Sequence, residues 1–192
     1  MNYSIRRLFS LTCVTCLLTL GCEDIDGYTP VSFIVEGDKA IMSGVIDSDI
    51  ISHVRELYEN HSDVTTIVMQ EVPGSIDDEA NLTAARLVRS YGLNTVVPTD
   101  GFIASGGVDF FLAGVERTIE PGAKLGVHTW GGDGFTGDEL PRDDPEHNRY
   151  LAYYSEMGIP TAFYWFTLEA APVEGIHVMT PAEIDQYKIT TQ

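Results

Sequence analysis

The hydrophobic positions of this chain change period several times, and each change predicts a new element of secondary structure. Residues 31–36 (VSFIVE) and 39–43 (KAIMS) are predicted strands on either side of a Gly-Asp turn, and residues 65–69 (TTIVM) form a β-branched run typical of a buried strand. Apolar side chains recur at helical spacing over residues 46–60 and 77–91. This succession of strands and helices predicts an α/β fold with a mostly parallel sheet.

The middle of the chain continues this pattern with shorter elements. Residues 95–98 predict a strand, and residues 108–112 predict an apolar helix. Two further strands are expected around Thr118 and Leu125, before the chain leaves the sheet.

The C-terminal part is predicted to be helical after a glycine- and acid-rich loop over residues 131–144. Helices are expected over residues 146–158 and 160–168. A last short helix begins at Pro181, with Thr180 as its N-cap. We expect these helices to cover the domain.

Three polar or glycine-containing segments follow the predicted parallel strands at the points where those strands end. They are residues 73–75 (PGS), Ser105 with the two glycines after it, and His128. Ligands of parallel sheets bind at the carboxyl ends of the strands, so we expect these segments to lie together.

Ser105 and His128 are the residue types that nucleophilic acyl hydrolysis needs. A serine at a strand-to-helix turn exposes its hydroxyl, and the amides of the first helical turn point at the group beside it. His128 would act as the base, and the backbone amides of Gly106 and Ser75 would stabilise the oxyanion. Gly106 and Gly107 lack the side chains that would keep a substrate backbone away. The simpler interpretation is that Ser105 only caps the helix.

The start of the chain has the composition of an export signal. Arg6 and Arg7 precede an apolar stretch over residues 8–20, which is too short to span a membrane. The sequence TLGC, which ends at Cys22, resembles a bacterial lipobox, and all three cysteines lie in this segment. We therefore expect Cys22 to carry lipid and no cysteine to act as a nucleophile.

These features divide the chain into three parts. We expect a lipoprotein-type signal peptide over residues 1–22, a tether over residues 23–30 and one domain over residues 31–192. The expected location is the bacterial cell envelope, with the protein anchored through lipid on the periplasmic side of a membrane. Simple cleavage to a soluble periplasmic protein is the alternative.

The strong negative charge limits the partners of the mature protein. There are 29 acidic and 11 basic residues, which give a formal net charge of −18. Such a surface repels phosphate backbones and anionic headgroups, so we expect no nucleic-acid partner and membrane contact only through the anchor. The histidines lack metal-ligand spacing, and we expect neither a metal nor a cofactor.

Three segments of the chain resemble the Clp-type serine peptidases of the Clp/crotonase superfamily, and especially their exported bacterial relatives. They are residues 73–75 (PGS), residues 104–107 (ASGG) with the helical run that ends in Ala-Gly, and residues 125–128 (LGVH). The resemblance covers about residues 40–187 and is tightest over residues 102–128. Ser75 departs from it, because that position of the turn is a glycine in the family.

The resemblance implies a spiral of ββα units, a serine–histidine–acid triad, and peptide or protein substrates. It also implies that a homo-oligomer can form, since many members are rings or trimers. The family's aspartate is missing at its expected place, and the nearest carboxylates before Thr180 are Glu174 and Glu169. We prefer Glu174 as the acid and keep Glu169 as the alternative.

Other functions remain open at this stage. A catalytically weak or inactive relative would bind a peptide or protein partner in the same cleft. A crotonase-type acyl-CoA enzyme would use the paired amides on an enolate, although export separates it from its cofactor. A Ser-Lys dyad would need one of the three lysines, Lys39, Lys124 or Lys188, and none has the spacing of that family.

Overall fold

The computed structural model describes residues 27–132 and 134–191, so the predicted signal peptide and Cys22 lie outside the described residues. The strands are β1 (Ser32–Glu36), β2 (Lys39–Ser43), β3 (Thr66–Val72), β4 (Asn94–Val97), β5 (Phe102–Ala104), β6 (Arg117–Ile119), β7 (Lys124–Val127) and β8 (His177–Val178). The α-helices are α1 (Ile50–Asn60), α2 (Asp78–Ser90), α3 (Gly106–Phe111), α4 (Asn148–Glu156), α5 (Thr161–Ala170) and α6 (Pro181–Gln186). Two 3₁₀ turns, η1 (Gly137–Glu139) and η2 (Pro145–His147), precede α4.

The sheet is mostly parallel and branches at β3. The first half of β3 pairs with β4, which pairs with β6. The second half of β3 pairs with β5, which pairs with β7. Only β1 and β8, at the two ends of the path, are antiparallel to their neighbours. The mixed α/β architecture with a mostly parallel sheet confirms the predicted fold class.

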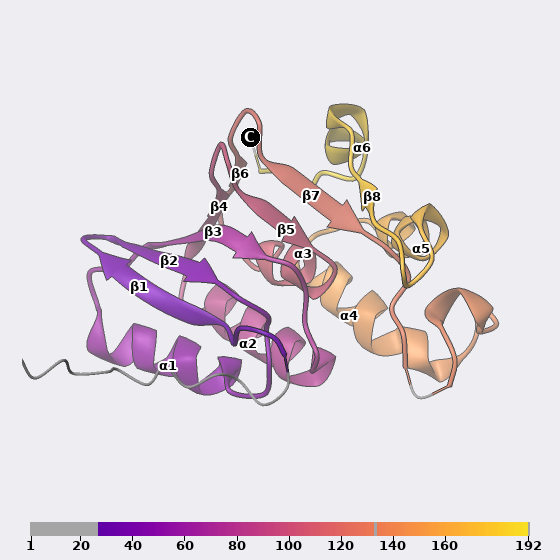
Figure 1. Cartoon of the computed structure of the whole chain (residues 1–192), viewed down its shortest axis with the longest axis horizontal. Helices are drawn as coiled ribbons and strands as arrows, with labels where there is room; N and C mark the ends of the chain where they lie inside the picture. Colours follow the sequence, from indigo (N-terminus) through magenta and orange to yellow (C-terminus); the bar gives the residue numbers. More distant parts are fainter. Residues whose placement is uncertain (1–26, 133, 192) are drawn as a thin grey trace, which may run out of the picture.

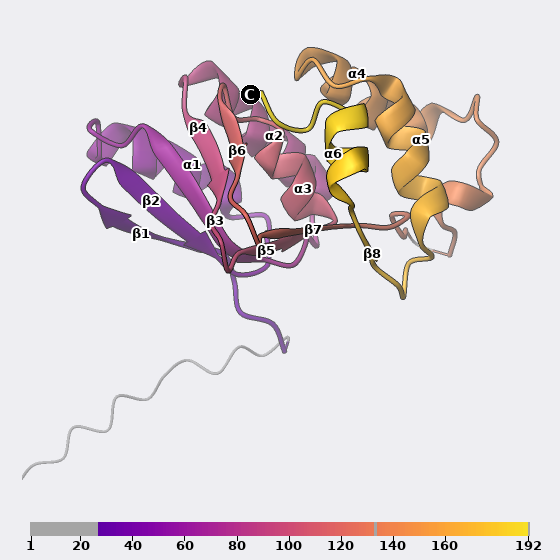
Figure 2. The same cartoon turned by 90° about the horizontal axis from the view of Figure 1, so that it is seen from above.

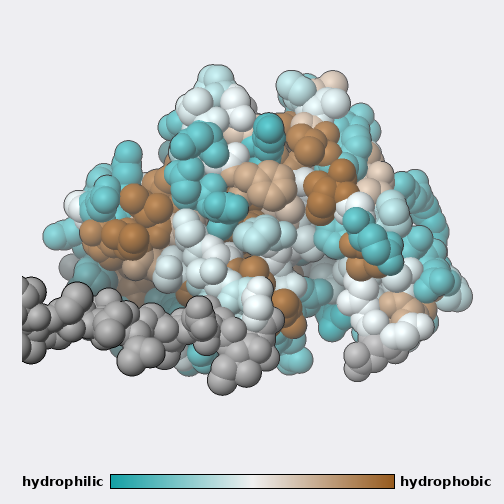
Figure 3. Space-filling model, viewed as in Figure 1, coloured by the Kyte–Doolittle hydropathy of each residue, from teal (hydrophilic) through white to brown (hydrophobic). Residues whose placement is uncertain are grey.

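Helices cover one face of the sheet, and α4, α5 and α6 lie beside its β7–β8 end (Figures 1 and 2). The core between the helices and the sheet includes Phe110 and Phe111 from α3, packed with Met69 from β3 and Ile103 from β5, all fully buried. On the opposite face, Ile176 and Val178 are exposed beside Phe102, and Figure 3 shows hydrophobic patches there.

The chain before α1 differs from the prediction. The predicted helix over residues 46–60 begins only at Ile50, because Val45 and Ile46 form parallel bridges to Pro30 and Ser75. The N-cap is Asp49, whose backbone amide donates to Asp47 Oδ1 (3.0 Å). The pairing of Pro30 with Val45 also ties the end of the expected tether to the domain.

Two strands were not predicted, and one of them positions the candidate nucleophile. Residues 102–104 form β5 between β3 and β7, whereas the prediction placed the last strand before Ser105 at residues 95–98. Residues 177–178 form β8 along β7. Both strands have too few residues for an alternating pattern to appear in the sequence.

No described helix is long and apolar enough to cross a membrane.

Candidate functional site

The three segments predicted to meet do follow adjacent parallel strands. β3 ends at Val72, β5 at Ala104 and β7 at Val127, and β5 lies between the other two in the sheet. The glycine turn, Ser105 and His128 follow these ends directly. Ser105 and His128 line the same narrow cavity, whose free volume is about 30 Å³.

Ser105 has a strained backbone conformation. Its φ of 51° and ψ of −129° lie in a region that non-glycine residues rarely adopt. The Ser105 amide donates to the carbonyl of Gly126 on β7 (2.9 Å), and the Ser105 carbonyl accepts from the amide of Val108 (2.8 Å). These bonds hold the sharp turn from β5 into α3.

The hydroxyl of Ser105 does not cap the helix. Ser105 is the N-cap residue of α3, but its side chain makes no capping hydrogen bond. This removes the simpler interpretation of the residue, because an N-cap serine normally accepts a bond from the second or third helical amide. The side chain instead lines the cavity.

The two glycines after Ser105 have a different role from the one predicted. A Cβ on Gly106 would lie 2.2 Å from Ser75 Oγ and 2.9 Å from Asn81 Nδ2, and a Cβ on Gly107 would lie 2.4 Å from the carbonyl oxygen of Val72. Protein atoms therefore occupy the space that the missing side chains leave. The glycines let α3 pack against the end of β3 and the start of α2.

The candidate oxyanion amides belong to the two segments that this packing joins. Ser75 is bridged to Ile46 through the carbonyl of Gly74 and the amide of Ile76, and not through its own amide. The Ser75 hydroxyl makes a short hydrogen bond to Asp78 Oδ1. The carbonyl of Gly106 accepts from Asn81 Nδ2 (2.8 Å), which fixes the peptide between Gly106 and Gly107.

His128 lies at the cavity, and no described carboxylate forms an ion pair with its imidazole. Its Nδ1 is buried and has no hydrogen-bond partner among the described residues. Burial lowers the pKa of His128, and the backbone of Thr129 and the negative charge of Asp78 oppose this shift. A neutral imidazole is the form that can accept a proton.

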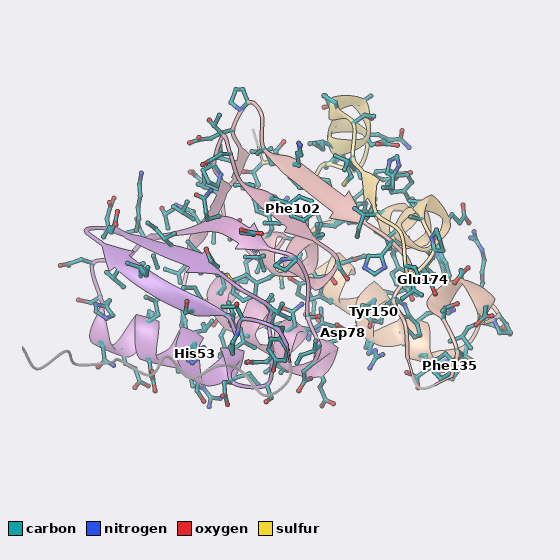
Figure 4. The ribbon with its side chains drawn as sticks, viewed as in Figure 1. His53, Asp78, Phe102, Phe135, Tyr150 and Glu174 are labelled. Carbon is teal, nitrogen blue, oxygen red and sulfur yellow. The ribbon has the colours of Figure 1, made fainter. Side chains whose placement is uncertain are left out.

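The structure does not bring either candidate triad acid to His128. Glu174 is exposed on the connection between α5 and β8 (Figure 4) and does not line the cavity. Glu169 is exposed and forms an ion pair with Arg142 (2.8 Å). Neither Glu174 nor Glu169 is therefore placed to act as the acid of a triad with His128.

Two other carboxyl groups, which were not predicted as site residues, line the cavity. Asp78 Oδ2 accepts a hydrogen bond from the Tyr150 hydroxyl (2.5 Å), and Asp109 Oδ1 accepts one from the Tyr154 hydroxyl (2.6 Å). Figure 4 shows Asp78 and Tyr150 near each other. The sequence signal for Asp109 was an acidic residue within an apolar helix, four positions after Ser105.

Burial controls the ionisation of this group of side chains. It raises the pKa of Asp109 to about 7, the Tyr154 hydrogen bond acts against this shift, and the charge of Asp78 adds to it. Burial likewise raises the pKa of Tyr150 and of Tyr154, so both phenols are neutral donors. At neutral pH, Asp109 therefore populates both its protonated and its ionised form.

Aromatic side chains form the remaining wall and are joined by a directed chain of hydrogen bonds. Trp130 Nε1 donates to the Tyr164 hydroxyl (2.9 Å), which lies 2.6 Å from His147 Nδ1. His147 Nε2 lies 3.1 Å from the carbonyl oxygen of Pro141. With its proton on Nε2, His147 accepts from Tyr164 and donates to Pro141, which satisfies every group in the chain.

Metal and lysine chemistry find no support at this cavity. The described residues contain no group of three or more histidine, cysteine, aspartate or glutamate side chains that could hold a metal ion. The three lysines, Lys39, Lys124 and Lys188, are all exposed, and none lines the cavity.

Comparisons with known proteins support the fold. No family model and no curated protein matches the sequence. An enoyl-CoA hydratase from Polaromonas sp. JS666 is 11% identical over 84% of this chain and 69% of its own, with a TM-score of 0.52. A probable enoyl-CoA hydratase/isomerase from Mycobacterium abscessus is 12% identical over 84% of this chain and 67% of its own, also with a TM-score of 0.52.

A third solved structure is a variant of the membrane-bound stomatin-specific protease 1510-N in complex with a substrate peptide. It is 14% identical over 82% of this chain and 75% of its own, with a TM-score of 0.49. At 11% and 12% identity, the likeness to the two hydratase structures shows a shared fold and carries no information about activity. That fold is the one that the Clp/crotonase resemblance implied.

Proposed function

We propose that this protein is an exported, lipid-anchored serine hydrolase that cleaves peptides, with Ser105 as the nucleophile and His128 as the general base. The observation that carries the proposal is the hydroxyl of Ser105, which sits on a strained turn, makes no capping bond and shares a cavity with His128. Strain of this kind concentrates at functional sites. The choice of peptides rests on the Clp-type resemblance of residues 102–128.

The oxyanion would be stabilised by the amides of Gly106 and Ser75. Both belong to the packed junction between α3 and the glycine turn, where Asn81 and Asp78 hold the surrounding groups in place. Fixed donors need no rearrangement as charge develops, and removing one such donor typically slows turnover by about 10²–10³-fold.

The unpartnered Nδ1 of His128 predicts slow turnover. A triad acid fixes the tautomer of the histidine and stabilises the imidazolium, and its loss costs orders of magnitude in rate without abolishing catalysis. We therefore expect a weak peptidase, consistent with the absence of an ion pair between His128 and Glu174 or Glu169 in the described part of the chain.

The same observation favours a second candidate, a protein that binds a peptide in this cavity without cleaving it. Incubation with a peptide library, followed by mass spectrometry of the products, distinguishes the two. Cleavage by the wild type that is lost in Ser105→Ala and in His128→Ala supports the hydrolase. Binding without cleavage, unchanged in Ser105→Ala, supports the binding protein.

Export and anchoring form a separate part of the proposal. The lipobox-like sequence before Cys22 supports lipidation there, and the domain begins to pair at Thr29 and Pro30. Metabolic labelling with a radioactive fatty acid should label the wild type and not Cys22→Ser. Labelling that persists in the variant would rule out this anchor.

A further inference from the structure

We infer that the cavity beside Ser105 binds a positively charged side chain of the peptide substrate, and lysine in particular. This inference rests on the proposed function, because it assigns the substrate class of that site. The side chain concerned belongs to the residue whose carbonyl group Ser105 attacks. That side chain is attached next to the attacked carbonyl, so it is the one that can enter a cavity lined by the nucleophile.

The first reason is that the two carboxyl groups of the cavity have no cationic partner. Neither Asp78 nor Asp109 takes part in any ion pair between described residues. Their recorded partners are the neutral hydroxyls of Ser75, Tyr150 and Tyr154. Both aspartates are half-buried, a position in which a carboxylate is normally stabilised by a nearby cation, and no described residue forms an ion pair with either.

The second reason is the position of Asp109 relative to the nucleophile. Asp109 follows Ser105 by four residues on α3, so both lie on the same side of the helix, about one turn apart. One Asp109 oxygen accepts the Tyr154 hydroxyl, and no hydrogen bond is recorded for the other. A cationic group that entered past Ser105 would therefore meet an available carboxylate oxygen.

The third reason is the composition of the walls. The rings of Trp130, Tyr150, Tyr154 and Tyr164 line the cavity together with the apolar side chains of Val108 and Val127. Apolar walls suit the methylene stem of lysine, and aromatic faces attract its ammonium group. The buried Nδ1 of His128, at the same cavity, is a further polar atom without a partner.

Arg149 already shows that the aromatic wall attracts a cation from outside. Its guanidinium carbon lies 4.9 Å from the ring centre of Tyr150 and 5.7 Å from that of Trp130. Arg149 is exposed, pairs with Glu146 (3.7 Å) and does not line the cavity. Arg149 and Asp78 line a neighbouring surface pocket, but Arg149 forms no ion pair with either aspartate of the cavity.

The small size of the cavity favours lysine over arginine. A free volume of about 30 Å³ admits a compact ammonium group more readily than a planar guanidinium group. The stem would require some opening of the walls. We expect the Trp130 side chain to provide it, because Trp130 lines the cavity and lies beyond the end of β7.

The enzymatic test uses a matched series of fluorogenic peptides that differ only at the residue before the cleaved bond. We expect kcat/KM to be at least ten-fold higher for lysine than for leucine, lower for arginine than for lysine, and lowest for glutamate. In Asp109→Asn, which keeps the size of the side chain and an acceptor for Tyr154, the lysine-to-leucine ratio should fall at least ten-fold. Asp63→Asn removes the same charge at an exposed position and should keep the ratio.

A binding test is independent of hydrolysis. Titration of the Ser105→Ala protein with n-butylammonium and with 1-butanol, followed by NMR, compares a lysine-like cation with a neutral molecule of similar shape. We expect n-butylammonium to bind and 1-butanol not to bind. Adding Asp109→Asn should weaken n-butylammonium binding at least five-fold.

The two tests separate the inference from the function on which it rests. Equal cleavage of lysine and leucine peptides would overturn the inference and leave the hydrolase standing. Binding of n-butylammonium that depends on Asp109, without cleavage of any peptide, would support the cation site and count against the hydrolase. An unchanged lysine-to-leucine ratio in Asp109→Asn would overturn the assignment of Asp109.

Discussion

Ser105 follows β5 and His128 follows β7, and the two strands are adjacent and parallel, with Ala104 in register with Gly126. Each residue therefore leaves the same edge of the sheet, and both side chains reach one cavity. The relationship depends on the hydrogen bond from the Ser105 amide to the carbonyl of Gly126, which joins the two strand ends (2.9 Å). Sheet pairing therefore brings the proposed nucleophile and the proposed base to one cavity from separate strands.

The lowered pKa of His128 predicts the acid limit of the pH profile. In the proposed mechanism His128 acts as a base in its neutral form, and burial lowers its pKa below the ordinary value of 6.5. For an uncharged peptide substrate, the ionisation of His128 should therefore appear in kcat/KM as an acid limb whose midpoint lies below pH 6.5. An acid limb above pH 6.5 would show that another group, or a differently placed His128, controls the reaction.

Gly106→Ala should destabilise the junction that carries the oxyanion amides. The new Cβ would lie 2.2 Å from Ser75 Oγ and 2.7 Å from Ser75 Cβ, so the backbone of one segment must move. Overpacking of this kind costs about 1–3 kcal/mol in free energy of unfolding, measured by urea denaturation. Gly175→Ala is the matched control, because its nearest neighbour is Pro172 Cδ at 3.4 Å. Equal stability of the two variants would mean that the backbone around Gly106 and Ser75 can move apart without a measurable cost in stability.

Asp109→Asn should stabilise the protein increasingly as the pH rises. The pKa of Asp109 is raised from 3.8 to about 7 in the folded state, so the folded protein holds a proton that the unfolded chain has lost. The stability that this proton provides is complete below about pH 4 and is lost as the pH rises through about 7. Urea denaturation at pH 5 and pH 8.5 should therefore show a larger advantage for the variant at pH 8.5. The same advantage at both values would contradict the raised pKa.

Tyr164→Phe should break the hydrogen-bond chain that holds the loop over the cavity. The Tyr164 hydroxyl bonds to Trp130 Nε1 and His147 Nδ1, and its loss leaves two polar atoms without partners. Leaving a buried donor or acceptor unsatisfied costs about 1–3 kcal/mol, so we expect a lower melting temperature. Tyr58→Phe, at an exposed ring stacked on Tyr91, removes a hydroxyl outside this chain and serves as the control. Equal melting temperatures would show that the chain contributes little.

The larger elements were predictable because their patterns are long. The β-branched run after residue 65 and the amphipathic helix before Gly92 indicated buried strands and crossover helices, and these place the glycine turn, Ser105 and His128 at one edge. The strand β5 was missed because its three residues, 102–104, are too few to show an alternating pattern. These residues become a strand because they pair with β3 on one side and β7 on the other.

The side chains around the nucleophile were harder to predict. Asp78 begins α2, and β4 and β5 separate that helix from Asp109 on α3. Only the packing of these elements brings both aspartates to the tyrosines of α4. Glu174 and Glu169 were found by counting back from Thr180, and Glu174 was preferred from the resemblance to exported relatives, but the connection before β8 leaves it exposed. Distance along the chain does not determine which carboxylate reaches a histidine on another strand.

Labelling with a fluorophosphonate probe tests the central claim most directly, because the probe reacts with an activated serine and requires no knowledge of the substrate. Intact mass and peptide mapping of the folded protein should show one adduct, located on Ser105 and absent from Ser105→Ala. Circular dichroism of that variant should show an unchanged fold. If the wild type does not label, or if the adduct lies on another residue, Ser105 is not the nucleophile that this account requires.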